Sequence, residues 1–341
     1  MTTKVNLKDI ASNLNLSVGT VSRVLNGKAK EYRIKEETVK RVLAYADKVG
    51  YSPNLLAKGL RNSKTYTIGL MIPDIANPFF SMMAKHIQRA ASDANYTILL
   101  VDAEEDIEKE EAQVRNLLNR QVDAIIAAPV GTSFKHFTSI QKQNIPFIFV
   151  DRYSKEDSIP FITSDNYQGG LDATNHLLSN GHRAIALVRG LEDIEPVIER
   201  RRGYEDALSQ AGVQIRQDLM VGNDFTEKNG YESTKTLLEL SNPPSAIFAM
   251  SNLIGLGVLK AVKEKGLRIP EDISVIVFDD QPYVAYLNPP ITTVKQNSEQ
   301  IGILAIDLIL KKIEQKNLSV KSQMIPVKLI NRSSVRDISG G

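Results

Sequence analysis

The 341-residue chain contains no cysteine, and this absence excludes disulfide scaffolds and cysteine-based zinc sites. The histidines could still bind a metal, but they are scattered along the chain rather than spaced as ligands. We therefore expect no metal site, and we expect each histidine to be a surface or structural residue: His86, His136, His176 and His182.

Long apolar runs are also absent. No segment approaches the roughly 18 apolar residues that a membrane-spanning helix requires, so we expect no role in a membrane. Residues 1–16 lack the basic start, apolar core and cleavage site of an exported protein. We therefore expect a cytoplasmic location, and an exported solute-binding protein is the less favoured alternative.

The motifs of common enzymes are missing as well. The chain has no Gly-x-Ser-x-Gly elbow, no P-loop lysine and no Gly-x-Gly-x-x-Gly after a first strand, and Gly255 and Gly257 lie within a helical pattern. The acidic residues Glu104 and Glu105 and the run 108–111 begin a polar helix, where carboxylates suit the helix dipole. We interpret them as a solvated face and predict neither catalysis nor a cofactor.

Charge is distributed unevenly along the sequence. Residues 1–64 hold 13 Lys and Arg against 5 Asp and Glu, a formal charge of +8, whereas the remaining residues hold 29 against 35, or −6. The small net charge of +2 therefore combines a basic N-terminal segment with an acidic remainder. A basic segment of this kind is suited to contacts with nucleic-acid phosphates.

Three short amphipathic helices are predicted in the basic segment. Asn6 can cap a helix over residues 7–14, and Ser17 can cap a second over residues 18–26 after a tight break. A third helix over residues 35–49 ends at Gly50, and the arrangement is that of a helix-turn-helix unit. The residues expected to face inward are Leu7, Ile10, Ala11, Leu14, Val21, Val24, Leu25, Val39, Val42, Leu43 and Ala46.

A break and a helical stub follow. Pro53 cannot continue the third helix, and Asn54 can cap residues 55–60, which are too few to form a stable helix alone. Two paired stubs could lie over a minor groove, with Ala57 allowing close approach and Leu60 inserted between base steps. A plain linker whose leucines pack on the next domain fits the same residues equally well.

From residue 65 onward, strands alternate with helices, which favours parallel sheets with helices on both faces. Strands are predicted over residues 67–72, 97–101, 124–127, 147–150, 184–188, 246–249 and 275–278. Helices are predicted over residues 79–95, 108–120, 134–143, 166–180, 200–211, 226–240 and 251–265. This segment exceeds a typical single core and is expected to divide in two.

The ordered motifs of the chain resemble those of the lactose-repressor and galactose-repressor family. They include LKDIASNLNLSVGTVSRVLNG, YSPNLLAKGL, TIGLMIPDIANPFF, SDNYQGGLDATNHLLSNGHRAIALV, RRRGYEDAL, DFTEKNGYEST and IPEDISVIVFDD, and together they span most of the sequence. The resemblance implies an α/β protein with an all-α head and a doubly wound parallel-sheet body of the periplasmic-binding-protein type. The function it implies is a DNA-binding transcriptional repressor controlled by a small molecule.

The resemblance also implies domain borders. The head would occupy residues 1–52, the hinge residues 53–64 and the body residues 65–341. Within the body, one subdomain would combine residues 65–165 and 294–323, and the other residues 166–293 and 324–341. Crossovers between the subdomains are expected near residues 163–166, 292–296 and 322–325.

By the same resemblance, base edges would be read by Val18, Gly19 and Arg23, while Ser17, Thr20, Ser22 and Asn26 would touch phosphate or frame the second helix. Arg23 can donate two hydrogen bonds to guanine, whereas Val18 offers only a methyl contact and Gly19 only shape. The loop before the third helix is longer than in many relatives. The hinge positions carried over are Asn54, Ala57 and Leu60.

The effector site is also carried over from the resemblance. Its aromatic, carboxylate, amide and guanidinium groups suit a carbohydrate. Ser251-Asn252 departs from the Asn-Asp of many relatives, so specificity cannot be copied from any of them. The implied positions are Asn77, Phe79, Phe80, Asp151, Arg152, Arg200, Phe225, Asn252 and Asp279.

The implied partners are a pseudo-palindromic operator and a second copy of the chain. We expect homodimer contacts mainly from the helix over residues 79–95, with Met82, Met83 and Ile87 as candidates, although these residues could equally face their own sheet. The polar tail has no leucine heptads, so a tetramer is not expected. Control by a protein co-repressor, as in carbon catabolite regulation, stays open as an alternative to a sugar.

Overall fold

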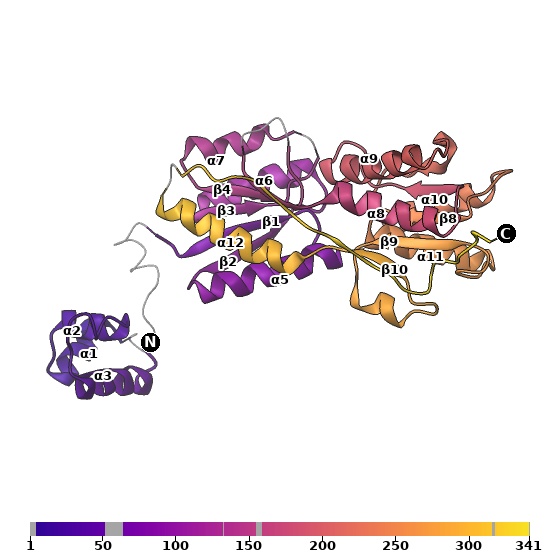
Figure 1. The fold of residues 1–341 in the computed structure, drawn as a ribbon. Helices are drawn as coiled ribbons and strands as arrows, with labels where there is room; N and C mark the ends of the chain where they lie inside the picture. Colours follow the sequence, from indigo (N-terminus) through magenta and orange to yellow (C-terminus); the bar gives the residue numbers. More distant parts are fainter. Residues whose placement is uncertain (1–4, 52–63, 132, 155–158, 316–317, 341) are drawn as a thin grey trace. The chain divides into compact units, whose positions relative to one another are not determined.

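A computed structural model describes residues 5–51, 64–131, 133–154, 159–315 and 318–340. The chain divides into two compact units, Met1–Thr65, here called the head, and Tyr66–Gly341, here called the body. Figure 1 shows the elements of each unit.

Over residues 5–51, the head forms the helices α1 (Leu7–Leu14), α2 (Val18–Leu25) and α3 (Glu36–Lys48), as the sequence predicts. Asn6 forms a capping box with Asp9 at the start of α1, and the Ser17 hydroxyl accepts the Thr20 N–H at 3.0 Å at the start of α2. Beyond α3, Gly50 adopts a left-handed conformation with φ of 62°, the usual role of a glycine after a helix.

The core of the head is small and fully apolar. Its buried residues are Ile10, Ala11, Val21, Val24, Val42 and Ala46. Leu43 corrects the sequence prediction, because its side chain is 49% exposed instead of buried. One helical step turns a side chain by about 100°, so the neighbour of the buried Val42 points away from the core.

The first sheet of the body has the strand order β11-β5-β4-β3-β1-β2, and all of its strand pairs are parallel. Its strands are β1 (Thr67–Ile72), β2 (Thr97–Asp102), β3 (Ala124–Ala127), β4 (Phe147–Val150), β5 (Phe161–Ser164) and β11 (Gln323–Ile325).

Helices cover both faces of the first sheet. Leu70 enters the apolar cluster under α5 (Pro78–Asp93) and α12 (Ser298–Glu314), whereas Met71 enters the cluster on the other face. The elements on that second face are α6 (Ile107–Asn119), η1 (Lys135–Phe137) and α7 (Thr138–Lys142). This is the doubly wound arrangement that the alternating pattern predicts.

The second sheet has the order β12-β10-β9-β8-β6-β7, in which only β12 is antiparallel to its neighbour. Its strands are β6 (Ile185–Val188), β7 (Met220–Val221), β8 (Ala246–Ala249), β9 (Ser274–Phe278), β10 (Thr292–Lys295) and β12 (Lys328–Ile330). Short 3-10 helices precede β7 and follow β9, namely η2 (Gln217–Leu219) and η3 (Pro282–Tyr286).

Four helices flank the second sheet. They are α8 (Asn166–Ser179), α9 (Glu195–Gln210), α10 (Glu227–Leu238) and α11 (Asn252–Glu264). Phe278 points to Gly169 of α8, whereas the adjacent Val277 points to Gly255 of α11. Because successive side chains of a strand alternate, α8 and α11 lie on opposite faces.

The chain crosses between the two lobes three times. The crossovers follow β5, β10 and β11, close to the predicted segments. The predicted subdomain borders at residues 293/294 and 323/324 fall inside β10 and β11, so each crossover comes slightly later in the chain.

Several elements were missed or misplaced by the sequence pattern. Helix α12 was not predicted, although an apolar stripe with Ile301, Ala305 and Ile309 marks it. The predicted helix over residues 134–143 is a short 3-10 turn followed by one turn of α-helix. Helix α9 begins at Glu195, before the predicted start at residue 200. The strands that were not predicted are β5, β7, β10, β11 and β12.

Helix α5 decides between the two alternatives left open for its apolar residues. Met83 and Ile87 have no exposed surface and belong to the core between α5, α12 and the first sheet. They are therefore not available to a partner chain. Met82 is only partly buried.

Close helix pairs fix the second lobe. A Cβ atom on Gly170 of α8 would lie 2.2 Å from the Arg200 carbonyl oxygen on α9, and one on Gly257 of α11 would lie 2.0 Å from the Glu227 carbonyl oxygen on α10. No real Cβ atom fits at such distances, so glycine lets each pair approach. The first of these contacts positions the backbone that carries Arg200.

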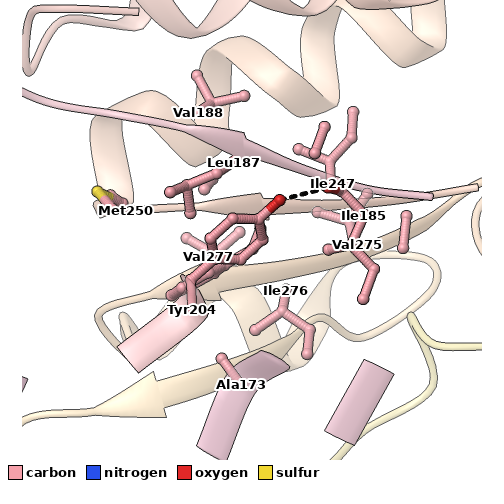
Figure 2. Packing of buried hydrophobic residues seen from close by; sticks show 14 of the residues in the cluster. Ala173, Ile185, Leu187, Val188, Tyr204, Ile247, Met250, Val275, Ile276 and Val277 are labelled. Atoms are coloured by element: carbon pink, nitrogen blue, oxygen red, sulfur yellow. Dashed lines mark hydrogen bonds between the residues drawn. The ribbon is translucent and has the colours of Figure 1, made fainter. Parts of the chain in front are cut away.

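Tyr204 anchors the same helix to the second sheet (Figure 2). Its side chain is 1% exposed and its hydroxyl donates to the Ile185 carbonyl oxygen at 2.8 Å. Burial raises the pKa of Tyr204, because the phenolate would lose its hydration. This buried hydrogen bond links α9 to β6.

Replacing Tyr204 by Phe should lower the free energy of unfolding by about 1–3 kcal/mol, because the buried carbonyl loses its side-chain donor. Urea titration of the full chain, followed by far-UV circular dichroism, measures this change. The matched control is Tyr231→Phe, whose hydroxyl bonds Glu264 on the exposed surface at 2.6 Å. The control should change stability by less than about 0.5 kcal/mol, and equal effects of the two variants would contradict the role of Tyr204.

Candidate functional site

The outward face of α2 presents the residues predicted to meet DNA. Gly19, Arg23 and Asn26 are exposed, and Val18 is 42% exposed at the start of the helix. Ser17 bonds both the backbone and the hydroxyl of Thr20, so the first turn is rigidly capped. Ser22 is partly buried. The hinge positions Asn54, Ala57 and Leu60 lie outside the described residues.

Arg23 has a contact that the sequence did not predict. Its guanidinium carbon lies 4.1 Å from the centre of the Tyr32 ring, which comes from the long loop between α2 and α3. Stacking on an aromatic face leaves the in-plane donors of a guanidinium group directed outward. Tyr32 of this loop therefore orients Arg23, the side chain of α2 that is best suited to bind a guanine.

A cleft lies between the two sheets of the body, at the carboxyl ends of their strands. This is the edge at which doubly wound sheets bind ligands. The predicted ligand residues other than Asn252 all line it, together with three residues that were not predicted. The lining consists of Asn77, Phe79, Phe80, Asp151, Arg152, Pro196, Arg200, Phe225, Ser251, Asp279 and Gln296.

The cleft is narrow in this conformation. Its open volume is about 20 Å³, whereas small-molecule sites usually enclose roughly 300–1,000 Å³. A sugar-sized ligand therefore requires side chains or lobes to separate before it can enter.

Two carboxylates occupy equivalent places in the two lobes. Asp151 directly follows β4 and Asp279 directly follows β9, and both have left-handed backbones with φ of 60° and 79°. Non-glycine residues rarely adopt this region, and such strain concentrates at functional sites. Burial raises the pKa of Asp151 to about 6, against the opposing effect of Arg200 and Arg152.

Arg200 is the central cation of the cleft and is only 4% exposed. It donates from Nε to the Asn166 side chain at 2.8 Å and from Nη1 to the Met250 carbonyl oxygen at 2.5 Å. Its guanidinium carbon lies 3.6 Å from the centre of the Phe278 ring. Asn166 begins α8 immediately after the first crossover, so Arg200 ties α9 to that crossover.

Asn252 joins the two lobes directly. Its Nδ2 donates to the Asn77 side chain of the first lobe at 3.1 Å and to Asp279 of its own lobe at 2.9 Å. Gln296, in the second crossover, donates to the other oxygen of Asp279 at 2.6 Å. An amide can serve both acceptors, which an aspartate at position 252 could not.

Arg152 fills the space between the lobes. Its guanidinium carbon lies 5.4 Å from the Phe80 ring and 5.1 Å from the Phe225 ring, which belong to different lobes. Both oxygens of Glu105 accept hydrogen bonds from it, at 2.7 and 2.5 Å. The prediction that Glu105 lies on a solvated face is therefore wrong, since its partner is buried in the cleft.

Glu110 is a second correction, because it has no exposed surface. It pairs with His136 Nε2 at 2.7 Å and accepts the Val130 N–H at 2.6 Å. Burial raises the pKa of Glu110, while these partners act in the opposite direction. The pair holds the loop after β3, next to the Pro129 carbonyl oxygen that Arg152 approaches.

His182 is a structural residue, as predicted. It is 2% exposed, and its ring nitrogens contact the Ser245 hydroxyl and the Arg336 carbonyl oxygen. Within the described part of the chain, no group of three or more His, Cys, Asp or Glu residues is placed to hold a metal. None of the helices described here is both long and apolar enough to cross a membrane.

Comparisons with known proteins account for both units. Residues 6–54 match the model of bacterial regulatory proteins of the lacI family, and residues 65–333 match that of periplasmic binding proteins and the sugar-binding domain of the LacI family. The match to the head sets the chain apart from an exported solute-binding protein, the alternative that the sequence left open.

Whole-length relatives are similar to this chain. Catabolite control protein A of Priestia megaterium is 32% identical, covering 97% of this chain and 99% of the relative. A ribose operon repressor of Halalkalibacterium halodurans is 35% identical, covering 97% of each. Among solved structures, a lac repressor dimer bound to operator and the anti-inducer ONPF is 25% identical with a TM-score of 0.85, covering 97% of this chain and 99% of that one.

The raised pKa of Asp151 predicts a pH dependence of stability. An ordinary Asp titrates near pH 4 when unfolded. Because the pKa of Asp151 in the folded chain is about 6, the folded chain binds this proton more tightly than the unfolded chain does between about pH 4 and pH 6. The contribution of Asp151 to stability should therefore fall as the pH rises from about 4 to about 6, and stay constant above that.

Denaturant titrations of the wild type and of Asp151→Asn at pH 4.5 and 7 test this expectation. The stability of the wild type relative to the variant should fall by on the order of 2 kcal/mol over this interval. Asp218→Asn is the control: a hydrogen bond from Arg216 lowers the pKa of Asp218, so this carboxyl is largely ionised in both states above pH 4.5 and the corresponding difference should hardly change over the interval. If the difference in free energy of unfolding between the wild type and Asp151→Asn does not change with pH, the raised pKa of Asp151 is refuted.

Proposed function

Because the chain belongs to the lacI family of bacterial regulatory proteins, we propose that the face of α2 reads its operator and that the cleft holds the molecule controlling operator affinity. The chain is a DNA-binding transcriptional repressor of this family. The observation that carries the site assignment is the network Asn77–Asn252–Asp279–Gln296, which joins both lobes and a crossover at one place.

The DNA-bound form is a homodimer on a pseudo-palindromic operator in the cytoplasm. Paired heads meet two half-sites at fixed spacing, so a two-fold symmetric protein matches a two-fold symmetric site. Arg23 supplies base readout, with Val18 and Gly19 fitted against the groove and Ser17, Thr20, Ser22 and Asn26 framing the helix. Asn54, Ala57 and Leu60 are proposed to act in the hinge.

The effector is a small molecule with the character of a sugar. Phe79, Phe80 and Phe225 offer aromatic faces for ring C–H groups, and Asp151, Asp279 and Arg200 offer hydrogen bonds to hydroxyls. Arg152 and Asn252 must rearrange for it to enter. The cleft binds this molecule without turnover, and it changes operator affinity only through its different affinities for two body conformations.

Arg23→Ala should weaken binding to the cognate operator by about 1–3 kcal/mol and relax preference at one base pair per half-site. Fluorescence anisotropy with an operator selected from random duplexes, and with its single-base variants, measures both effects. Affinity for a scrambled duplex is the control and should change less, because phosphate contacts persist. A uniform loss across all variants would show that Arg23 contacts only the backbone.

Arg200→Ala should abolish the effector response while leaving operator binding in the absence of sugar. Arg200 lines the cleft, its guanidinium is held by Asn166, Met250 and Phe278 of the body, and it takes no part in the head. The test compares operator affinity with and without each sugar that raises the melting temperature of the wild type. Lys260→Ala, which removes an exposed contact with Glu227, is the control that should keep the response. An unchanged response in Arg200→Ala would remove this residue from the site.

A further inference from the structure

We propose that the cleft selects uncharged, hydroxyl-rich ligands over phosphorylated or carboxylated ones, and that Glu105 sets this selection by occupying Arg152. The inference rests on the proposed function of the cleft as the effector site. It assigns a specificity-determining role to a residue that lies outside the cleft lining.

Glu105 engages Arg152 in the geometry that an anionic ligand would need. Both carboxylate oxygens accept from the two terminal guanidinium nitrogens, at 2.7 and 2.5 Å. The side chains of Arg152 and Glu105 are 4% and 29% exposed. A phosphate or carboxylate prefers this same fork. It would have to displace Glu105 and leave that carboxylate unpaired in a partly buried place, which is unfavourable.

The turn after β2 holds Glu105 in position. Glu104 and Glu105 both have left-handed backbones, with φ of 50° and 53°. The Glu105 N–H donates to the Pro73 carbonyl oxygen at 2.7 Å, and the Ala103 N–H donates to that of Ile72 at 3.0 Å. Such strained residues persist only where the surroundings fix them. The carboxylate is therefore presented to Arg152 by the backbone.

The charges of the site also oppose an anion. Asp151, Asp279 and Glu105 supply three carboxylates, against the two guanidinium groups of Arg152 and Arg200, so the formal sum is −1 when all are ionised. Arg200 is already bonded to Asn166 and to the Met250 carbonyl oxygen. In a buried site of low dielectric, an added anion meets net repulsion.

Unsatisfied polar atoms in the cleft and beside it favour the same ligand class. Asp151 Oδ1, Asn252 Oδ1 and Gln296 Oε1 are buried without a hydrogen-bond partner among the described residues. Their side chains belong to residues only 5%, 3% and 8% exposed. All three atoms are acceptors, so they require donors. Hydroxyl groups donate, whereas ionised phosphate and carboxylate oxygens only accept.

A matched pair of variants tests the inference. Glu105→Gln removes the charge that neutralises Arg152, whereas Glu104→Gln removes the same charge one residue earlier in the same turn. Glu104 instead pairs with Lys109 at the surface, at 2.6 Å, and its side chain is 63% exposed. Thermal shift and titration calorimetry are performed with ribose, glucose and cellobiose, and with ribose 5-phosphate, glucose 6-phosphate and inorganic phosphate.

We expect the three phosphate compounds to bind Glu105→Gln at least about tenfold more tightly than Glu104→Gln, a factor that corresponds to about 1.4 kcal/mol. Any of the neutral sugars that binds should bind the wild type and Glu104→Gln alike. The inference is overturned if the two variants have equal affinities for all three phosphate compounds, or if the wild type prefers a sugar phosphate to its parent sugar. If Glu105→Gln does not fold, Glu105→Asp, whose shorter side chain cannot keep both bonds, must show a smaller gain in the same direction, and no gain overturns the inference.

Operator binding by each variant, measured without sugar, separates this inference from the proposed function. Loss of the phosphate effect with operator binding intact refutes only the role of Glu105. A wild-type chain that prefers no DNA sequence would refute the proposed function, whatever the calorimetry shows.

Discussion

The structure of the body depends on hydrogen bonds that compensate the buried charges of Arg200 and Asp279 between its two lobes. Arg200 and Asp279 are only 4% and 5% exposed, and a charged side chain buried to this extent is unfavourable without partners. Their partners come from separate segments: Asn166 after the first crossover, Gln296 in the second, and Asn252 at the start of α11. The first two crossovers are therefore held in place by hydrogen bonds to polar residues that line the cleft. A ligand that changes one of these hydrogen bonds acts on the connection between the lobes.

The two lobes have the same topology. Each lobe has a six-stranded sheet with the same relative strand order. In each lobe, an aspartate with a left-handed backbone directly follows the fourth strand in chain order, Asp151 after β4 and Asp279 after β9. Parallel strands bring their carboxyl ends to one edge, so Asp151 and Asp279 approach from opposite sides. Glycines also let helices approach closely in both lobes: Gly302 brings α12 to α5 in the first, and Gly170 and Gly257 close the pairs of the second.

Local chemistry made much of the fold predictable. Asn6 and Ser17 cap their helices through side-chain hydrogen bonds that depend only on nearby residues, and buried parallel strands such as β1 and β3 read as continuous apolar runs. Short edge strands such as β7 and β11 carry no such signal. Helix α12 does carry one, in its apolar stripe, and could have been identified from it.

Most residues that line the cleft could be predicted from the sequence, but their hydrogen bonds and ion pairs could not. Family resemblance identified most of the lining but not Pro196, Ser251 or Gln296. Glu105 and Glu110 were assigned to a solvated face because their local pattern is that of a polar helix start. Their partners, Arg152 and His136, are distant in sequence and lie beside them only in the folded structure. The stacking of Tyr32 on Arg23 was missed for a related reason, since an inserted loop has no periodicity to place its side chains.

The narrowness of the cleft constrains how any effector can work. The open volume of about 20 Å³ among the lining residues is too small for a sugar ring, although a cavity of about 540 Å³ shares Phe79, Asp279 and Gln296 with it. A ligand bound among the predicted residues therefore has to displace side chains. Arg152, between the Phe80 and Phe225 rings, occupies the space where a ring would stack, and it already bridges the lobes. A ligand that enters therefore replaces the contacts of Arg152 with Phe80 and Phe225 by its own contacts with the two lobes. The response of the operator depends on the difference between these two sets of contacts, because a ligand with equal affinity for both conformations would shift nothing.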